Sequence, residues 1–349
     1  MNDLYDLQLF AGEANTQTTG HGGLSAEMKT YYGMELLENA KPQLVHNQFA
    51  ATKPLPTGGG KTVEWRKFGS FEKALTPLTE GVTPDGSGIS VSYITKELAQ
   101  YGDYTTVSDL LDLTAIDDVV LEITDRHGSN MGLTLDTVTR NEIQQGSQVI
   151  YAPKLGADGG QTAVLHRYDL TEGCKLTSEL VAKAATQLKK MNAPTFEGKY
   201  VCILHPSVAF DLRQDPAWVA AHQYAAATEL FSGEIGELHG VRFIETTEAK
   251  VFNGEGCPVK TAADESNGTP AEYYSVYATL FLGKDAYGMI DPEGGNMEMI
   301  IKDKGQVGGP LNQFSTLGYK FSSAAKILYQ DRMVRVESCG AYSAEDEAN

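Results

Sequence analysis

Two stretches in the first third of the chain alternate between apolar and polar residues. In KTVEWRKF, Val63 and Trp65 share one side while Glu64 and Arg66 share the other. A second such stretch, residues 89–101, follows LTPLTEGVTPDGSG, which is dense in turn residues. Period-two alternation around a turn-rich tip predicts a long β-hairpin. Because a hairpin without its own core is only marginally stable, we expect it to lie on another surface.

Apolar positions that recur every three or four residues predict helices. The first begins at Leu24 in LSAEMKTYYGMELLENA. The longest pattern runs from about Ile116 to Gln145, and at 1.5 Å per residue it would form a helix of roughly 40 Å, which suits a structural spine. A third helix lies in TSELVAKAATQLKKMNAP, with Thr177 as its N-cap and Pro194 beyond its end.

The rest of the chain predicts a mixed α/β region followed by terminal strands. YVCILHP is an apolar strand, and PSVAFDLRQD begins a short helix at Pro206. YYSVYATLFL is too short to span a membrane and is interpreted as a buried strand. Strands are also predicted in NMEMIIKD, LGYKFSSAAKIL and DRMVRVESC. Residues 250–271 are predicted to form a polar surface loop, and the acidic tail SAEDEAN a disordered end.

The stretch PLPTGGGKTVEW raises the question of a phosphate-binding loop. Such a loop needs a glycine five positions before the glycine of the GK pair, and Leu55 occupies that position. It also needs a preceding strand and a following helix, whereas here two prolines precede and a strand follows. We therefore interpret Gly58, Gly59 and Gly60 as a hinge at the base of the hairpin.

Charge and cysteine content narrow the classes of function. The 349 residues include 28 basic and 46 acidic side chains, for a net charge of −18. Such a chain repels phosphate backbones and is a poor candidate for reading a nucleic-acid sequence. The four cysteines are far apart and form no C-x-x-C pair, which indicates free thiols rather than a zinc site or a disulfide framework.

No motif in the sequence carries catalytic chemistry. The seven histidines are scattered without an H-E-x-x-H pair, and His127 is interpreted as a core or interface residue. Asp109 and Asp112 lie in the first turn of a helix, where carboxylates favour the helix dipole. We therefore predict no catalytic residue, no metal site and no cofactor, and we expect the protein not to be an enzyme.

The order of these parts resembles the major capsid proteins of tailed bacteriophages. Several segments are similar to the N-four-type major capsid family: LSAEMKTYYGMELLENAKPQLVHNQF, GGKTVEWRKF, LTPLTEGVTPDG, QYGDYTTVSDLLDLTAIDD, LTLDTVTRNE, GEIGELHGVRFIET and LGYKFSSAAKILYQDRMVRVES. The resemblance implies the α+β class and the Hong Kong 97-type fold, which has an N-terminal arm, an extended β-hairpin loop, a peripheral domain with a long spine helix, and an axial α/β domain.

That fold implies a division of the chain into six parts. The parts are the N-terminal arm (1–23), the N-terminal helix and connector (24–53), the extended β-hairpin loop (54–100), the peripheral domain with its spine helix (101–150), the axial domain (151–290) with a surface insertion at 250–271, and the returning peripheral strands with the acidic tail (291–349).

The resemblance also implies a function in self-assembly. Copies of the chain would form the hexamers and pentamers of an icosahedral head that encloses double-stranded DNA, within the virion capsid and after assembly in the host bacterial cytoplasm. Expected partners are other copies, portal, scaffolding or decoration proteins, and packaged DNA bound without sequence specificity; no membrane partner is expected. One alternative is a bacterial nanocompartment shell of the same fold, and another is a nucleotide-binding enzyme that uses GGGKT.

In such an assembly, the hairpin would lie over a neighbouring subunit. The residues expected to contact the neighbour are the apolar anchors Trp65, Phe68 and Phe71 and the charged residues Arg66, Lys67, Glu72 and Lys73. The acidity of the chain would suit an inner shell surface that does not trap the genome.

Overall fold

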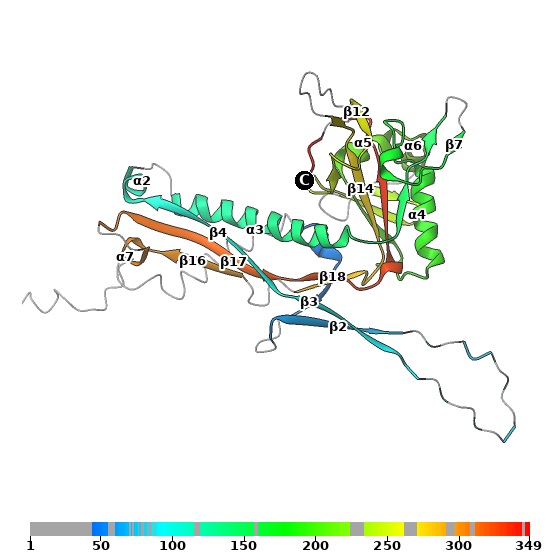
Figure 1. The fold of residues 1–349 in the computed structure, drawn as a ribbon, viewed down its shortest axis with the longest axis horizontal. Helices are drawn as coiled ribbons and strands as arrows, with labels where there is room; N and C mark the ends of the chain where they lie inside the picture. Colours follow the sequence, from blue (N-terminus) through cyan, green and yellow to red (C-terminus); the bar gives the residue numbers. More distant parts are fainter. Residues whose placement is uncertain are drawn as a thin grey trace, which may run out of the picture. The chain divides into compact units, whose positions relative to one another are not determined.

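The chain forms two compact units in a computed structural model (Figure 1). The described part of the first unit comes from Ala99–Thr134 and Pro292–Ser323, and that of the second from Val45–Leu98, Leu135–Asp291 and Ala324–Asn349. The structure describes residues 44–54, 60–69, 88–114, 119–156, 160–223, 234–261, 271–290, 297–307, 311–343 and 346–349, together with 71, 73–75, 77, 80–81, 83 and 86. The predicted arm and first helix, Gly58, Gly59 and Glu72 lie outside these residues.

The first unit is built on a three-stranded antiparallel sheet. Its order is β16-β17-β4, formed by Met297–Lys302, Phe314–Ser323 and Ala99–Ser108. Strands β4 and β17 pair over ten residues, because Ala99 faces Ser323 at one end and Ser108 faces Phe314 at the other. Two short helices adjoin the sheet, α2 (Asp109–Thr114) after β4 and α7 (Lys304–Val307) after β16.

The predicted spine helix is present as α3 (Val119–Ile143), which contributes residues to both units. Within the first unit, every second residue over most of β17 is buried, and these residues share one face of the sheet. On that face, the ring centre of Tyr319 lies 5.4 Å from the ring centre of His127 on α3. His127 is 5% exposed, which agrees with the interpretation of a packed histidine. Ser108 accepts a hydrogen bond from the Leu111 amide at 3.3 Å and so caps α2.

The second unit is built on a seven-stranded sheet. Its main path is β5-β19-β14-β8-β10-β9, with β11 paired to β14 off this path. These strands are β5 (Val149–Tyr151), β8 (Tyr200–Leu204), β9 (Glu234–Leu238), β10 (Val241–Glu245), β11 (Val251–Phe252), β14 (Val276–Leu282) and β19 (Met333–Ser338). The same unit contains the helices α4 (Ser178–Lys190), α5 (Pro206–Gln214) and α6 (Pro216–Gln223).

Both faces of this sheet are covered. On one face, Leu188 of α4 and Leu212 of α5 share a core with Cys202 and Phe281. The other face packs Ile203 and its neighbours against the end of α3. Burial from both sides explains why every residue of β14 is buried, as its apolar run predicts. The Thr177 cap of α4 and the start of α5 at Pro206 also follow the predictions.

Smaller elements complete the second unit. A three-stranded sheet of order β1-β15-β18 contains Ala51–Lys53, Tyr287–Ile290 and Ala325–Ile327. Two short strand pairs are β6–β7 (Lys154–Leu155 with Gln161–Thr162) and β12–β13 (Val259–Thr261 with Glu272–Tyr273). The short helices are η3 (His46–Phe49), η4 (Arg167–Asp169) and η5 (Gln330–Arg332). All four cysteines are buried free thiols, and no helix of the described residues is long and apolar enough to cross a bilayer.

Three features differ from the sequence predictions. Strand β19 pairs with β5 and β14 of the second unit, so not all of the C-terminal strands return to the sheet of β4 and β17. The described part of the predicted loop 250–271 contains β11, β12 and three buried residues, Val251, Cys257 and Pro258. The acidic tail is not a free end, because Asp346 and Asn349 hydrogen-bond to the second unit. Each difference arises from contacts between residues far apart in sequence.

Candidate assembly surface

The predicted hairpin is formed by β2 (Thr62–Phe68) and β3 (Val91–Glu97) of the second unit. In its register, Phe68 faces Val91 and Arg66 faces Tyr93. Residues directly opposite each other in an antiparallel pair point to the same side. The hairpin therefore has two distinct faces, and alternate residues along each strand belong to opposite ones. We call them the inner and outer faces.

The inner face is anchored in its own chain. Val63 is 2% exposed and Trp65 is 8% exposed, and both pack in one cluster with Ile290 and Ala324. The indole lies against the backbone of Gly288, where an added Cβ would come within 2.7 Å of the indole Nε1. Trp65, predicted to contact a neighbouring subunit, is therefore buried within its own chain. The alternation indicates which residues share a face, but not which face the chain itself covers.

Two lysines and one glutamate connect the hairpin to the rest of the second unit. Glu142, near the end of α3, accepts hydrogen bonds from Lys96 Nζ at 2.8 Å and Lys326 Nζ at 2.7 Å. Burial alone would raise the pKa of Glu142, but the bonds from these two lysines outweigh that effect and leave its pKa below the ordinary value. The carboxylate thus links β3, β18 and α3, which positions the hairpin on the second unit.

The charged candidates divide between the two faces. Lys67 points inward and places its ammonium 4.6 Å from the ring centre of Tyr329. Arg66 points outward, where its guanidinium lies 5.9 Å from the ring of Tyr93 and its Nε 3.7 Å from Glu64. Such exposed contacts contribute little stability, so Arg66 is available to a partner. Lys73 is exposed as well.

The outer face carries a strip of exposed apolar side chains. Phe68 is 57% exposed, Tyr93 59% and Val91 40%. Towards the tip the large exposed apolar residues continue with Phe71, Leu75 and Ile89. Soluble proteins rarely leave such a strip in water unless it contacts another surface. Phe68 and Phe71, predicted to contact a neighbouring subunit, are thus accessible to one, while Val91 and Tyr93 join them because of the cross-strand pairing.

Of the three glycines in the predicted hinge, Gly60 lies among the described residues. It lies two positions before β2 and has a φ of +87°, a backbone conformation that would be strained for a residue with a side chain. The described residues that follow it form a strand rather than a helix. The geometry therefore lacks the helix N-terminus that a phosphate-binding loop needs, and GGGKT is not such a loop.

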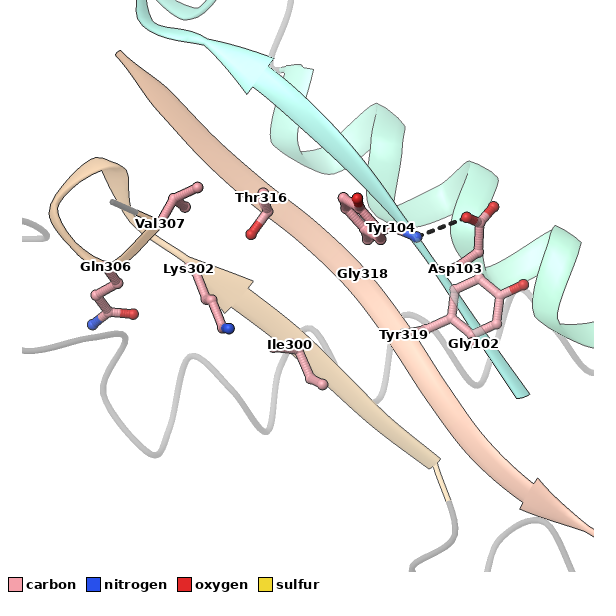
Figure 2. A pocket seen from close by; sticks show the side chains of 10 residues that line it. All are labelled: Gly102, Asp103, Tyr104, Ile300, Lys302, Gln306, Val307, Thr316, Gly318 and Tyr319. Carbon is pink, nitrogen blue, oxygen red and sulfur yellow. Dashed lines mark hydrogen bonds between the residues drawn. The ribbon is translucent and has the colours of Figure 1, made fainter. Parts of the chain in front are cut away.

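A second candidate for a contact surface lies in the first unit. It is the face of the three-stranded sheet that does not carry the Tyr319 ring. A hollow of about 400 Å³ opens there, and Tyr104, Gly318 and Ile300 face one another across its three strands (Figure 2). A Cβ on Gly318 would come within 2.7 Å of the Tyr104 Cβ, so glycine is required for this close approach. Among the described residues, no group of three or more His, Cys, Asp or Glu side chains could hold a metal ion.

Solved structures with a similar fold are capsid and shell proteins. The cyanophage Pam1 capsid matches 96% of this chain and 99% of its own, at 13% identity and a TM-score of 0.59. The capsid of Ralstonia phage GP4 matches 81% of this chain and 84% of its own, at 13% identity and a TM-score of 0.59. The SrpI encapsulin of Synechococcus elongatus PCC 7942 matches 90% and 93%, at 12% identity and a TM-score of 0.52.

The sequence itself gives the more specific result. A comparison with curated protein sequences found no match. The model of a family described as phage capsid protein, however, matches residues 90–306, which is more than half of the chain. The fold agrees with that match, because phage capsids are among the solved structures of similar fold. The chain therefore belongs to the phage capsid protein family and has the Hong Kong 97-type fold.

Proposed function

We propose that the chain is the major capsid protein of a tailed phage and forms the hexamers and pentamers of an icosahedral head. The observation that carries this proposal is the outer face of the hairpin, where Phe68, Val91 and Tyr93 are exposed while Trp65 anchors the opposite face. A surface that is held firmly by its own chain and still apolar towards water suits burial against another copy.

The neighbouring subunit is the partner that this surface requires. Apolar contact at Phe68, Phe71 and Tyr93 supplies attraction, and Arg66 and Lys73 at the same strip add charge complementarity for an acidic chain. The six-part division of the chain, with the hairpin at 54–100, applies to this assembly except that β19, in the last part, belongs to the sheet of the second unit. A hinge at Gly58 to Gly60 lets the hairpin adjust to pentamers and hexamers.

The wider setting follows from this role. Assembly takes place in the host bacterial cytoplasm, and the finished shell encloses double-stranded DNA without sequence-specific contacts. A net charge of −18 favours an inner surface that does not bind the genome tightly. Portal, scaffolding or decoration proteins are further partners of such a shell, and the protein is structural rather than enzymatic.

A nanocompartment shell is the alternative of the same fold. The encapsulin match supports it as far as the fold is concerned. The phage family match favours the capsid, because that family is defined by sequence. The contents of purified shells distinguish the two functions, since a phage capsid would hold DNA and a nanocompartment would hold a cargo enzyme.

Electron microscopy of the purified protein tests the proposal. Closed icosahedral shells or capsomers are expected, together with the absence of a heat of binding when ATP or GTP is titrated by calorimetry. Deletion of residues 72–88, the hairpin tip, is expected to leave a folded protein that forms no shells. Shells of normal size and yield from that deletion would contradict the role given to the hairpin.

A further inference from the structure

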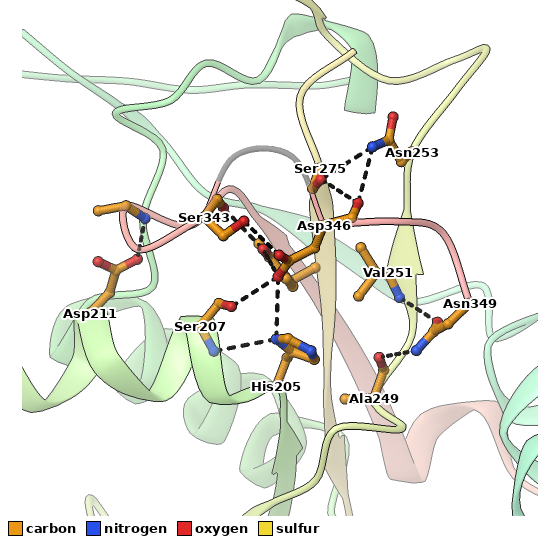
Figure 3. A network of polar contacts seen from close by, with 12 residues as sticks. His205, Ser207, Asp211, Ala249, Val251, Asn253, Ser275, Ser343, Asp346 and Asn349 are labelled. Atoms are coloured by element: carbon orange, nitrogen blue, oxygen red, sulfur yellow. Dashed lines mark hydrogen bonds and ion pairs between the residues drawn. The ribbon is translucent and has the colours of Figure 1, made fainter. Parts of the chain in front are cut away.

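The tail of the chain is hydrogen-bonded to a set of polar groups on the second unit, which we call the tail site. Figure 3 shows Asp346 and Asn349 reaching polar groups from β11, from Ser275 just before β14 and from the start of α5. These partners lie between 69 and 139 positions away in sequence. The tail site is therefore a feature of the folded body, and the tail is the segment that is bonded to it.

The body presents a receptor for one carboxylate. Oδ2 of Asp346 accepts hydrogen bonds from the Tyr277 hydroxyl at 2.6 Å and the Ser207 hydroxyl at 3.0 Å. His205 stacks on Tyr277 with ring centres 5.0 Å apart, and its Nδ1 lies 4.0 Å from the same oxygen. The other carboxylate oxygen, Oδ1 of Asp346, accepts a hydrogen bond from the hydroxyl of Ser343 in the tail itself at 2.5 Å. Hydrogen bonds to a charged acceptor are the stronger kind, so this contact selects an acidic side chain.

These contacts set the charge state of the groups involved. Partial burial opposes the charge on Asp346, but the bonds from Ser343, Tyr277 and Ser207 outweigh it and hold its pKa below the ordinary value. Burial lowers the pKa of His205, although the nearby Asp346 opposes that effect. At neutral pH the tail site therefore holds an ionised aspartate beside a neutral histidine.

The body also forms hydrogen bonds with the backbone of the tail and with one of its side-chain amides. The carbonyl oxygen of Asp346 accepts bonds from Ser275 Oγ at 2.7 Å and Asn253 Nδ2 at 3.0 Å. Three residues later, the side-chain amide of Asn349 pairs with the open edge of β11. Its Oδ1 accepts from the Val251 amide at 2.9 Å and its Nδ2 donates to the Ala249 carbonyl at 3.0 Å. The amide thus replaces one peptide group of an added strand.

Two of the receptor groups are fully buried, while the end of the tail is held by little apolar contact. Ser275 and Tyr277 are 0% exposed. Glu347, Ala348 and Asn349 are exposed, and the ring contact of Tyr342 with Phe210 leaves Tyr342 70% exposed. A segment with few buried apolar contacts opens at a lower free energy than the core around it.

We propose that the tail site is a peptide-binding site specific for an extended Asp-x-x-Asn segment, which the chain's own tail fills through an equilibrium separate from folding. The tail site consists of His205, Ser207, Asn253, Ser275, Tyr277, Val251 of β11 and Ala249 just before it. Its occupant is the segment with Asp346 and Asn349, supplied by the same chain or, on exchange, by a second copy. The site is distinct from the hairpin and does not depend on shell formation.

A labelled peptide of residues 340–349 tests the site directly. In a full-length chain carrying Asp346→Ala and Asn349→Ala the tail loses its side-chain bonds to the tail site, and fluorescence anisotropy is expected to show saturable binding of the wild-type peptide. The wild-type chain is expected to bind it at least about tenfold more weakly, because its own tail competes. An Asp346→Ala peptide loses charge-assisted bonds and is expected to bind about 10- to 100-fold more weakly. A Glu347→Ala peptide is the matched control, with unchanged affinity.

Two results would overturn the proposal: no binding of the wild-type peptide to the double variant, or equal binding of the wild-type and Asp346→Ala peptides. Hydrogen exchange provides a test that does not depend on that variant. In a full-length Asp346→Asn chain, the Val251 amide is expected to exchange at least about tenfold faster, while amides of β14 keep their protection. Unchanged exchange at Val251 would also refute the site.

Discussion

Replacement of Phe68 by alanine separates assembly from folding. Phe68 is 57% exposed on the outer face of the hairpin, and an aromatic side chain presents about 200 Å² in all, so roughly 110 Å² is available to a partner. At about 25 cal/mol per Å², burial of that area is worth up to roughly 2.8 kcal/mol per contact. Loss of the contact corresponds to about a 100-fold weaker association at each interface. Since every subunit repeats the contact, shell assembly should fail at concentrations where the wild-type chain assembles.

The assay compares Phe68→Ala with Trp65→Ala. Sedimentation velocity and electron microscopy measure assembly, and calorimetry of the unassembled subunits measures Tm. Phe68→Ala should keep the wild-type Tm, because its side chain contributes little to the subunit itself. Trp65→Ala should lower the free energy of unfolding by about 3–5 kcal/mol, because it empties a buried site beside Gly288. Wild-type shell yield from Phe68→Ala, or a large loss of Tm in that variant, would refute the assignment of the two faces.

Three further substitutions test the structure of the subunit by its thermal unfolding. Glu142→Gln should lower Tm at neutral pH, and it should flatten the fall of stability in acid. The lowered pKa of Glu142 means that its stabilisation is present above its ordinary pKa and is lost as the pH falls through the lowered one; parallel acid profiles would contradict this. Gly318→Ala should disrupt the pairing of β4 with β17, whereas Gly305→Ala, which meets nothing within 4 Å, should be tolerated; equal Tm values would argue against the close approach. Asp136→Ala should cost about 3 kcal/mol, since it leaves the amide and ring nitrogen of the buried His46 without their 2.7 Å and 2.6 Å bonds; an unchanged Tm would count against that pair.

Local chemistry accounts for the parts of the fold that the sequence predicts well. The caps at Ser108 and Thr177 bond to amides three residues away, so spacing along the chain is sufficient to find them. The alternation through Val63 and Trp65 likewise predicts a strand and its two faces. Such signals depend on neighbours in sequence, and they are present in the sequence whether or not the tertiary fold is known.

The remaining features depend on contacts between distant residues. Strand β19 reads as a strand from its own pattern, but nothing local indicates that it pairs with β5 and β14. The inner position of Trp65 depends on Gly288 and Ile290, which lie more than two hundred residues further along. Asp346 looks like part of a solvated acidic tail until its bonds to Ser207 and Tyr277 are known. The outer face could be recognised from sequence only by combining the strand register with knowledge of what covers the inner face.

Cryo-electron microscopy of assembled particles tests most directly whether the hairpin joins subunits. We expect closed icosahedral shells in which the outer face of each hairpin, at Phe68, Val91 and Tyr93, is buried against a neighbouring subunit while Trp65 stays within its own chain. A protein that remains monomeric under all assembly conditions would contradict this role, as would shells in which that outer face is open to solvent.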